Sequence, residues 1–250
     1  MPHKQLIGTV VTPVQTLGTK IKNGFSDFFA SMTKYNDVVK ENEELKKLLT
    51  EKQSELDEFF HLESENERLK NLIGIKEANP EFEFVAADVV SRSTDGWDGT
   101  ITINVGTSDG IKKKNVVLTG QGLVGLVTDV GYNWATVTTV LDPRIAVGAI
   151  VSRTNDIGMT EGSAELKADG LCRLSYMETN VSVNRGDTVK TSGLGGTYPK
   201  DLPIGIISDI VIEEHGLSMY ALIKPYEDIM NVRRVYIITN FDNAGVLDEE

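Results

Sequence analysis

Cysteine and histidine are scarce in this sequence, which contains one cysteine and three histidines among 250 residues. A single cysteine excludes an internal disulfide and any zinc site built on several cysteines. The thiol belongs to Cys172, which lies between Leu171 and Leu174 in an apolar, strand-like context. We therefore expect a buried, inert thiol rather than a nucleophile.

The three histidines, His3, His61 and His215, lie in widely separated segments. A Ser-His-Asp mechanism would require His215 to reach Ser192 and an orienting aspartate, and nothing in the spacing favours that geometry. The acidic residues just before His215 would alternate between the two faces of a strand, which disfavours a shared metal ion. We therefore predict no catalytic, cofactor-binding or metal-binding residues.

Positive charge and long hydrophobic runs are also lacking. The chain carries 25 Lys and Arg against 37 Asp and Glu, a net charge of −12, which argues against a nucleic-acid partner because phosphate contacts need clustered basic residues. No run approaches the roughly 18 apolar residues of a membrane span, and no signal-peptide pattern is present. We expect a soluble chain or the ectodomain of a longer protein.

Residues 35–74 carry the strongest periodic signal in the sequence. Apolar residues recur at alternating spacings of four and three, which is the heptad repeat of a coiled coil. The positions that would face a partner helix are Val38, Asn42, Leu45, Leu49, Lys52, Leu56 and Phe59, followed after a phase slip by Leu62, Asn66, Leu69 and Ile73. Such a slip is a stammer, which locally overwinds a pair of helices.

Two asparagines, Asn42 and Asn66, occupy core a positions of this repeat. A buried asparagine favours a parallel, in-register dimer because only that pairing lets the two amides bond each other. The alternative is a single long helix folded onto its own domain, and Lys52 at a core d position supports it. We expect residues 35–74 to form a coiled-coil dimerisation helix.

The chain before this helix, residues 1–34, has apolar residues at helical spacing interrupted by Pro13, Gly18 and Gly24. We expect a frayed, membrane-proximal lead-in, since glycines weaken an isolated helix. With its lysines on the other side, the same segment could instead lie on a membrane surface. Residues 241–250 form an acidic tail.

Beyond Gly74, which we expect to end the helix, and Pro80, the pattern changes to short β-rich runs separated by turn residues. The expected strands are 83–91, 100–105, 115–118, 122–130, 135–141, 145–151, 158–161, 171–176, 188–191, 205–213, 219–224 and 234–239. These runs predict a mainly β fold with an N-terminal coiled-coil helix and two small antiparallel β-barrel or sandwich-like domains in tandem. We place the domains at residues 80–152 and 153–240, divided near Ser152–Asn155, although the last strand could return to complete the first domain.

A glycine-rich loop in the second domain is the segment that looks most like a signature. Its notable residues are Gly186, Asp187, Ser192, Gly193, Gly195, Gly196, Pro203 and Gly205, and we expect them to mark an interaction site. The loop lacks the ending of a nucleotide-binding loop, and Lys190 stands where the first glycine of a Gly-x-Ser-x-Gly elbow belongs. Lys190 and Ser192 would share one strand face, so a Ser–Lys dyad is conceivable but has little support.

Several motifs occur in a characteristic order behind the predicted stalk. They are Gly120-Gln121-Gly122-Leu123-Val124-Gly125-Leu126-Val127, Leu141-Asp142-Pro143-Arg144-Ile145-Ala146-Val147-Gly148, Gly186-Asp187, Ser192-Gly193-Leu194-Gly195-Gly196 and Pro203-Ile204-Gly205. With this order, residues 35–240 resemble the bacterial rod shape-determining MreC family. The resemblance implies a bitopic protein with a helical dimer stalk and two β-domains, and no enzymatic activity or cofactor.

The same resemblance implies a scaffold of the cell-wall elongation machinery, with MreD, MreB and elongation-type penicillin-binding proteins as partners. The family's transmembrane helix is absent from the sequence, so we expect an ectodomain that works at the outer face of the cell membrane. Asp201 stands where members often have glycine, and aspartate tolerates the left-handed backbone that such a turn needs.

We therefore expect a non-catalytic, homodimeric scaffold that maintains rod cell shape by organising peptidoglycan-synthesis enzymes. The β-domains would offer strand edges on which a partner could add a strand. Two alternatives remain open from the sequence: a β-barrel serine hydrolase built around Ser192, and a ligand-binding sensor.

Overall fold

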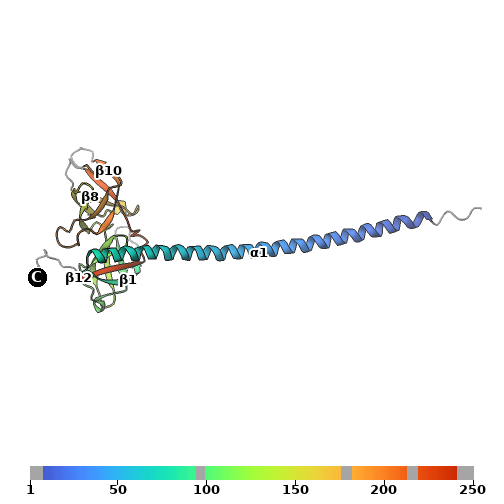
Figure 1. Ribbon diagram of the computed structural model, residues 1–250, viewed down its shortest axis with the longest axis horizontal. Helices are drawn as coiled ribbons and strands as arrows, with labels where there is room; N and C mark the ends of the chain where they lie inside the picture. Colours follow the sequence, from blue (N-terminus) through green and yellow to red (C-terminus); the bar gives the residue numbers. More distant parts are fainter. Residues whose placement is uncertain (1–7, 94–98, 176–181, 213–218, 241–250) are drawn as a thin grey trace, which may run out of the picture. The chain divides into compact units, whose positions relative to one another are not determined.

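A computed structural model describes residues 8–93, 99–175, 182–212 and 219–240, with side chains described from Val38 onward. Helix α1 (Gly8–Ala78) is continuous over 71 residues (Figure 1). It therefore runs across Gly18 and Gly24, where we expected a frayed lead-in, and four residues beyond Gly74, where we expected it to end. A helical glycine costs only about 1 kcal/mol, so neither position had to break the helix.

The end of α1 is fixed by backbone capping and by proline. Asn79 N–H donates to the carbonyl of Ile75, and Lys76 Nζ donates to the carbonyl of Pro80. Because Pro80 cannot continue the helix, the chain turns there into the first strand. No stretch of α1 among the described residues combines the length and the apolar character needed to cross a bilayer.

Every expected strand is present, and each boundary lies within two residues of its expected place. The strands are β1 (Glu83–Arg92), β2 (Thr100–Ile103), β3 (Val116–Leu118), β4 (Leu123–Val130), β5 (Ala135–Thr139), β6 (Ala146–Val151), β7 (Ile157–Glu161), β8 (Cys172–Ser175), β9 (Thr188–Thr191), β10 (Pro203–Ile212), β11 (Met219–Pro225) and β12 (Arg234–Asn240). Two short helices, η1 (Thr107–Asp109) and α2 (Ala164–Lys167), lie between strands.

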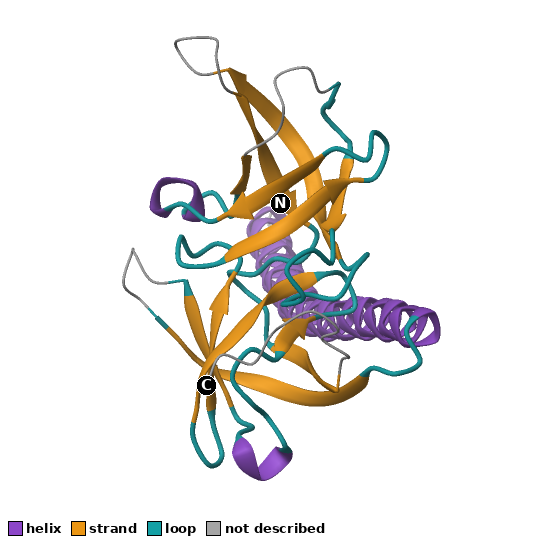
Figure 2. Cartoon of the chain, turned by 90° about the vertical axis from the view of Figure 1, so that its left-hand side faces the viewer, coloured by secondary structure: helices purple, strands orange, loops and turns teal. Residues whose placement is uncertain are grey.

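The strands form two closed antiparallel barrels, seen as two groups of orange strands in Figure 2. The first barrel has the order β1-β12-β3-β4-β5-β2, and the second has the order β10-β11-β8-β7-β6-β9. The predicted fold class, mainly β with an N-terminal helix and two tandem barrels, is confirmed. The last strand, β12, belongs to the first barrel, where it pairs with β1 and β3.

Two expectations need correction. The division near Ser152–Asn155 is wrong, because β6 pairs with β7 and β9 and therefore belongs to the second barrel. Local periodicity identified the strand but could not identify its partners. The expectation of free strand edges is also wrong for the described strands, since both barrels close and a closed barrel has no edge to extend.

The interior of the first barrel forms one apolar cluster, in which Val117, Val124, Val137 and Ile237 are buried. A second cluster fills the second barrel and also includes Val116 and Leu118 from β3. Because alternate residues of β3 point in opposite directions, this strand is buried on both of its faces. Burial on both faces explains its unbroken Val116-Val117-Leu118 run.

Candidate functional site

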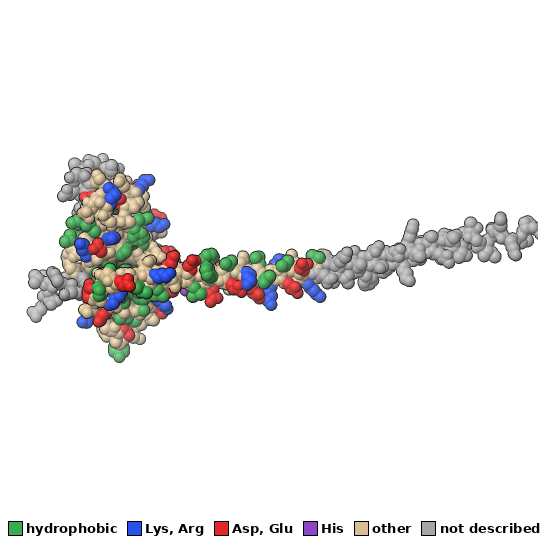
Figure 3. Space-filling view, viewed as in Figure 1, with side chains coloured by type: hydrophobic (Ala, Val, Ile, Leu, Met, Phe, Trp, Pro, Cys, Tyr) green, Lys and Arg blue, Asp and Glu red, His purple; other side chains and the backbone are tan. Residues whose placement is uncertain are grey.

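The apolar stripe predicted on the helix is exposed to solvent along its whole described length. We call the set Val38, Asn42, Leu45, Leu49, Leu56, Phe59, Leu62, Asn66, Leu69 and Ile73 the heptad stripe, and every member is exposed. Among its apolar members the exposed fraction runs from 41% at Leu69 to 61% at Val38. Figure 3 shows hydrophobic and charged side chains along this part of the helix. No other part of the chain that the structure describes covers the heptad stripe.

The last turns of α1 pack on the barrels through a different face. Glu65, Arg68, Leu72 and Ile75 are half-buried, at spacings typical of one helix face. Leu72 and Ile75 pack against the cluster that fills the second barrel, whereas the neighbouring Leu69 and Ile73 of the heptad stripe remain exposed. The end of the helix thus has one face docked on the barrels and another face free.

Two glycines of the β3–β4 turn permit close approach at this point, one by the helix and the other by the second barrel. A Cβ placed on Gly120 would overlap the backbone carbonyl of Arg68 in α1, and one on Gly122 would lie 2.7 Å from the carbonyl oxygen of Pro203 in the second barrel. The Gly-Gln-Gly motif and the Pro-Ile-Gly motif therefore meet, with the helix, at one junction. Local sequence reasoning identified the motifs but not their contact, because the contact depends on tertiary packing.

An ion pair between Arg68 and Glu227 crosses this junction. Arg68 Nη2 lies 3.3 Å from Glu227 Oε1, and the Glu227 side chain is almost fully buried. Arg68 Nε and Glu227 Oε2 are buried without a hydrogen-bond partner among the described residues. A buried carboxylate that is only partly satisfied loses much of the Coulombic gain to desolvation, so this ion pair contributes little net stability to the docking.

A groove of about 530 Å³ opens beside the junction. Its walls come from the end of α1, the Gly120–Gln121 turn and the second barrel. Ile75, Ala78, Leu202 and Pro203 supply apolar surface, and Lys70 and Lys190 supply positive charge. A concave surface of this kind, shared by three elements, suits an interaction with a partner segment.

The turn that opens the signature loop is fixed by an arginine–aspartate pair. Gly186 has φ +89°, and Asp187 accepts hydrogen bonds from Arg153 Nε and Nη2, both at 2.7 Å. Asp187 also accepts from the backbone N–H of Asn184. The Arg153 guanidinium holds the pKa of Asp187 below its ordinary value, against the opposing effect of burial. These contacts give Gly186 and Asp187 a structural role.

Three glycines of the signature loop adopt the left-handed region of backbone conformation. Gly193, Gly195 and Gly196 have φ values of +76°, +81° and +67°, which side chains rarely adopt. Between them, Leu194 turns outward with 60% of its surface exposed. Ser192 Oγ accepts a hydrogen bond from Leu194 N–H at 3.2 Å, which stabilises the turn. The loop thus holds one exposed leucine between glycines of positive φ.

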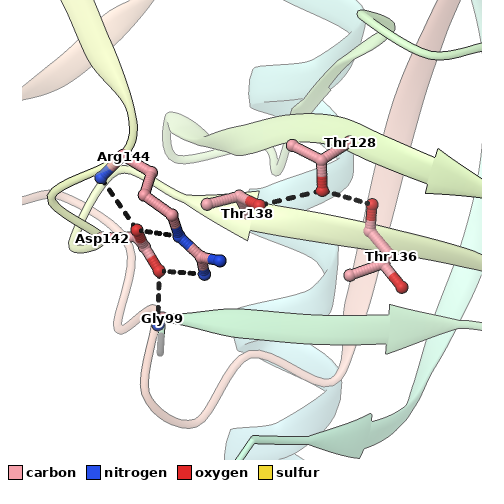
Figure 4. A network of polar contacts seen from close by, with 6 residues as sticks. All are labelled: Gly99, Thr128, Thr136, Thr138, Asp142 and Arg144. Atoms are coloured by element: carbon pink, nitrogen blue, oxygen red, sulfur yellow. Dashed lines mark hydrogen bonds and ion pairs between the residues drawn. The ribbon is translucent and has the colours of Figure 1, made fainter. Parts of the chain in front are cut away.

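The connection between the barrels is fastened by Asp142, which is completely buried (Figure 4). Its carboxylate accepts hydrogen bonds from Arg144 N–H, Nε and Nη2 and from Gly99 N–H, at 2.7–2.9 Å. Burial raises the pKa of Asp142, but these four donors outweigh burial and lower it overall. Asp142 thereby joins the first barrel to the chain that enters the second.

The geometry offers no support for the hydrolase reading. Ser192 Oγ is engaged with the loop backbone, which is a structural use of a serine. Burial raises the pKa of Cys172 to about 12, so the thiol is protonated and inert, as expected. Among the described residues, no three His, Cys, Asp or Glu side chains cluster as metal ligands. His3 and His215 lie outside the described residues.

Comparison with known proteins gives a consistent result. The family model described as rod shape-determining protein MreC, barrel core, matches residues 89–239. The cell shape-determining protein MreC of Listeria monocytogenes is 33% identical over 214 residues, covering 84% of this chain and 72% of the relative. The protein of the same name from Bacillus subtilis is 29% identical over 258 residues, covering 99% and 88%.

Solved structures agree with the sequence relatives. MreC from Listeria monocytogenes has a TM-score of 0.59 at 31% identity, over 83% of this chain and 100% of the solved chain. Another solved MreC chain has a TM-score of 0.62 at 21% identity, over 71% of this chain and 98% of its own, a likeness that shows the fold alone. Since the family model covers more than half of the sequence, the chain belongs to the MreC family of rod shape-determining proteins.

Proposed function

We propose that this chain is a non-catalytic, homodimeric scaffold of the cell-wall elongation machinery, acting at the outer face of the cytoplasmic membrane to maintain rod cell shape. Relatives across several bacteria are named cell shape-determining proteins. In this role the helix sets the dimer, and the barrels supply the surfaces on which enzymes of peptidoglycan synthesis are organised.

The observation that carries the proposal is the exposed heptad stripe beside a docked helix face. Leu72 and Ile75 already pack on the barrels, whereas Leu69 and Ile73, on a neighbouring face of the same turns, stay exposed. Fully burying one leucine or isoleucine side chain stabilises by about 1.5–3 kcal/mol. A second copy of the same helix would cover the stripe along its length, and Asn42 and Asn66 would favour the parallel register.

The partnership with penicillin-binding proteins draws support from the family. One solved complex is described as penicillin-binding protein PBP2 with MreC from Helicobacter pylori, whose chain matches this one with a TM-score of 0.50 at 14% identity. That likeness is one of fold, so the partnership is a proposal for this chain. We include MreD and MreB among the proposed partners because the family resemblance implies them.

Sedimentation equilibrium tests the dimer directly. We expect the wild-type chain to be dimeric and the Leu45→Asp/Leu69→Asp variant to be monomeric, because each aspartate places a charge in the helix interface. Lys47→Asp is the matched control, since it adds the same side chain at an exposed position off the stripe. Circular dichroism establishes that the barrels remain folded. A wild-type chain that stays monomeric at high concentration would show that the heptad stripe does not dimerise this chain.

A further inference from the structure

The turn that joins β4 to β5 in the first barrel, residues 131–134, displays two aromatic side chains. Tyr132 is 77% exposed, the largest fraction among the large hydrophobic side chains that the structure describes, and Trp134 is 41% exposed. Neither ring belongs to the apolar clusters that fill the barrels. Single exposed hydrophobic residues are ordinary, but two rings on one turn concentrate apolar surface at one point of the first barrel.

The segment around η1 fixes the backbone of this turn. Thr107 N–H donates to the carbonyl of Gly131 at 2.9 Å, and the N–H and Oγ of Ser108 both donate to the carbonyl of Tyr132, at 3.0 and 2.8 Å. A Cβ placed on Gly106 would lie 2.5 Å from the Gly131 oxygen and 2.6 Å from the Tyr132 oxygen, so the close approach requires glycine. The turn is therefore held in one conformation before any ligand binds, which reduces the entropy cost of binding.

The indole of Trp134 packs on the same turn. A Cβ placed on Gly131 would lie 2.2 Å from Nε1 and 2.3 Å from Cε2 of the ring, so this contact also requires glycine. Gly131 N–H donates to the carbonyl of Trp134 at 2.8 Å and closes the turn. The ring is thus positioned by the backbone, while a large part of the residue stays open to solvent.

A groove of about 780 Å³ begins on the η1 segment. Asp109, which directly follows Ser108, lines it together with Lys112. The remaining walls come from the end of α1, the start of β1 and the end of β12, and they include Glu83, Phe84 and Thr239. The groove and the aromatic turn are therefore joined through η1 into one surface. We call Tyr132, Trp134, Asp109, Lys112, Glu83 and Thr239 the turn–groove surface.

The chemistry of this surface matches a carbohydrate. Glu83 and Asp109 can accept hydrogen bonds from hydroxyl groups, and Lys112 and Thr239 can donate them. A sugar ring carries C–H groups on its faces and hydroxyl groups around its edge. The negative face of an aromatic ring attracts the C–H groups, and polar side chains of both kinds bind the hydroxyl groups.

Other partners fit the turn–groove surface less well. Nucleic acid would meet the carboxylates of Glu83 and Asp109, which repel phosphate. A bilayer surface would gain little, because two rings on one turn provide far less apolar area than an amphipathic helix inserts. A stable protein interface needs about 800 Å² on each partner with a hydrophobic centre, whereas the open groove is lined by charged and polar groups as well as apolar ones.

We propose that the turn–groove surface binds the glycan strand of peptidoglycan, a polymer of N-acetylated amino sugars that carries carboxylates. A polymer suits a surface that runs from an exposed turn into a groove, because successive sugar units occupy successive parts of it. In this arrangement Tyr132 and Trp134 stack on sugar rings, and Lys112 attracts the carboxylates. The inference rests on the proposed function, which places the barrels outside the membrane with the enzymes that make this polymer.

Co-sedimentation of the whole chain with insoluble peptidoglycan tests the inference, with peptidoglycan purified from the same bacterium and freed of attached polymers and proteins. We expect wild type to bind and Tyr132→Ser/Trp134→Ser to bind at least about tenfold more weakly, the loss typical of removing central aromatic contacts. Tyr132→Ser alone should weaken binding without changing thermal unfolding, because this side chain is almost fully exposed. Val90→Ser is the matched control, since Val90 is 60% exposed on β1 of the same barrel, and it should change affinity less than about twofold.

Tryptophan fluorescence reports on the turn itself. The sequence has two tryptophans, so Trp97→Phe leaves Trp134 as the sole emitter. Soluble fragments released from the same peptidoglycan should shift its emission to shorter wavelength. Lys112→Glu should weaken binding of these fragments and reduce its dependence on salt, because it removes an attraction that ions screen. Chitin oligosaccharides, which lack carboxylates, should bind equally to both forms.

The possible failures are distinguishable. A wild-type chain that does not bind peptidoglycan, or binding that the Tyr132 and Trp134 variants leave unchanged, would overturn the inference and leave the dimeric scaffold intact. Binding to vesicles of anionic phospholipid but not to peptidoglycan, abolished by the same variants, would assign the turn to a membrane surface and also overturn it. Peptidoglycan binding by a chain that is monomeric in sedimentation equilibrium would support the inference and contradict the proposed dimer.

Discussion

The two barrels each have six strands, yet they are closed from different parts of the chain and face different surroundings. The first barrel takes β1–β5 from one end of the barrel region and β12 from the other, and its strand β3 is buried on both faces. The second barrel is continuous from β6 to β11 and exposes apolar side chains on β7. The difference teaches that the first barrel is closed by distant parts of the chain and buried at β3, whereas the second is continuous in sequence and leaves large side chains of β7 open to solvent.

The largest expected effect comes from removing the strand that closes the first barrel. Ending the chain at Asn231 deletes β12 and leaves β1 and β3 without their common partner. We expect the first barrel to unfold and the second barrel to keep its structure, because all six of its strands remain. Hydrogen exchange measured strand by strand reports this as lost protection in β1–β5 and retained protection in β6–β11. Equal loss in both barrels would mean that they unfold as one cooperative unit.

A smaller but still large effect is expected at the junction. Gly120→Ala introduces a Cβ that overlaps the backbone of Arg68, and neither backbone can move freely. We expect a loss of about 3 kcal/mol in the free energy of unfolding, at the upper end of typical overpacking costs. Gly74→Ala is the control, and it should change the free energy of unfolding in the opposite direction, since nothing lies within 4 Å of the added methyl group. It should stabilise the helix by about 0.5–1 kcal/mol in the same urea titration.

The link between the barrels can be loosened at Asp142. Asp142→Ala removes the acceptor for Gly99 N–H and for the Arg144 side chain, leaving a buried donor without a partner. We expect a loss of about 2 kcal/mol in the free energy of unfolding, as is usual for such a group. Differential scanning calorimetry should then show the barrels unfolding less cooperatively. A single transition of unchanged shape would show that Asp142 does not couple them.

The smallest expected effect is an acid sensitivity confined to the second barrel. Because Arg153 lowers the pKa of Asp187 in the folded chain, protonation favours the unfolded state. The stabilisation is present above the ordinary aspartate pKa of about 3.9 and is lost as the pH falls through the lower, folded pKa. We expect the thermal midpoint of Asp187→Asn to fall less steeply than that of wild type below about pH 4. Parallel curves would contradict the role of the pair.

Local sequence patterns were sufficient for the strands and for the fold class, although not for the two ends of the long helix. Short β-rich runs separated by turn residues predicted strands at 115–118 and 158–161, where β3 and β7 lie. The heptad repeat predicted a helix, and the structure leaves its apolar residues exposed. In each case the signal depends on residues close together in the chain, where periodicity is informative.

Those local patterns could not predict which distant strands pair with each other. Residues 145–151 were correctly predicted to form a strand, which is β6. The assignment of this strand to the first domain was wrong, because β6 pairs with β7 and β9. The close contacts of Gly120 and Gly122 are equally non-local, since each meets a different element of the fold. The Gly120-Gln121-Gly122 motif stood out as glycine-rich in the sequence, and its role became visible only through the atoms that an added Cβ would overlap.

The return of β12 also imposes an order on folding. Thr239 Oγ1 donates to the carbonyl of Glu83, and these residues are 156 positions apart in the chain. During synthesis the second barrel has all of its strands before β12 emerges, while β1 and β3 wait with unpaired edges. Contacts this distant in sequence form slowly, and unpaired edges invite association with other chains. The interval before closure is therefore the period in which the nascent protein most needs protection by a chaperone.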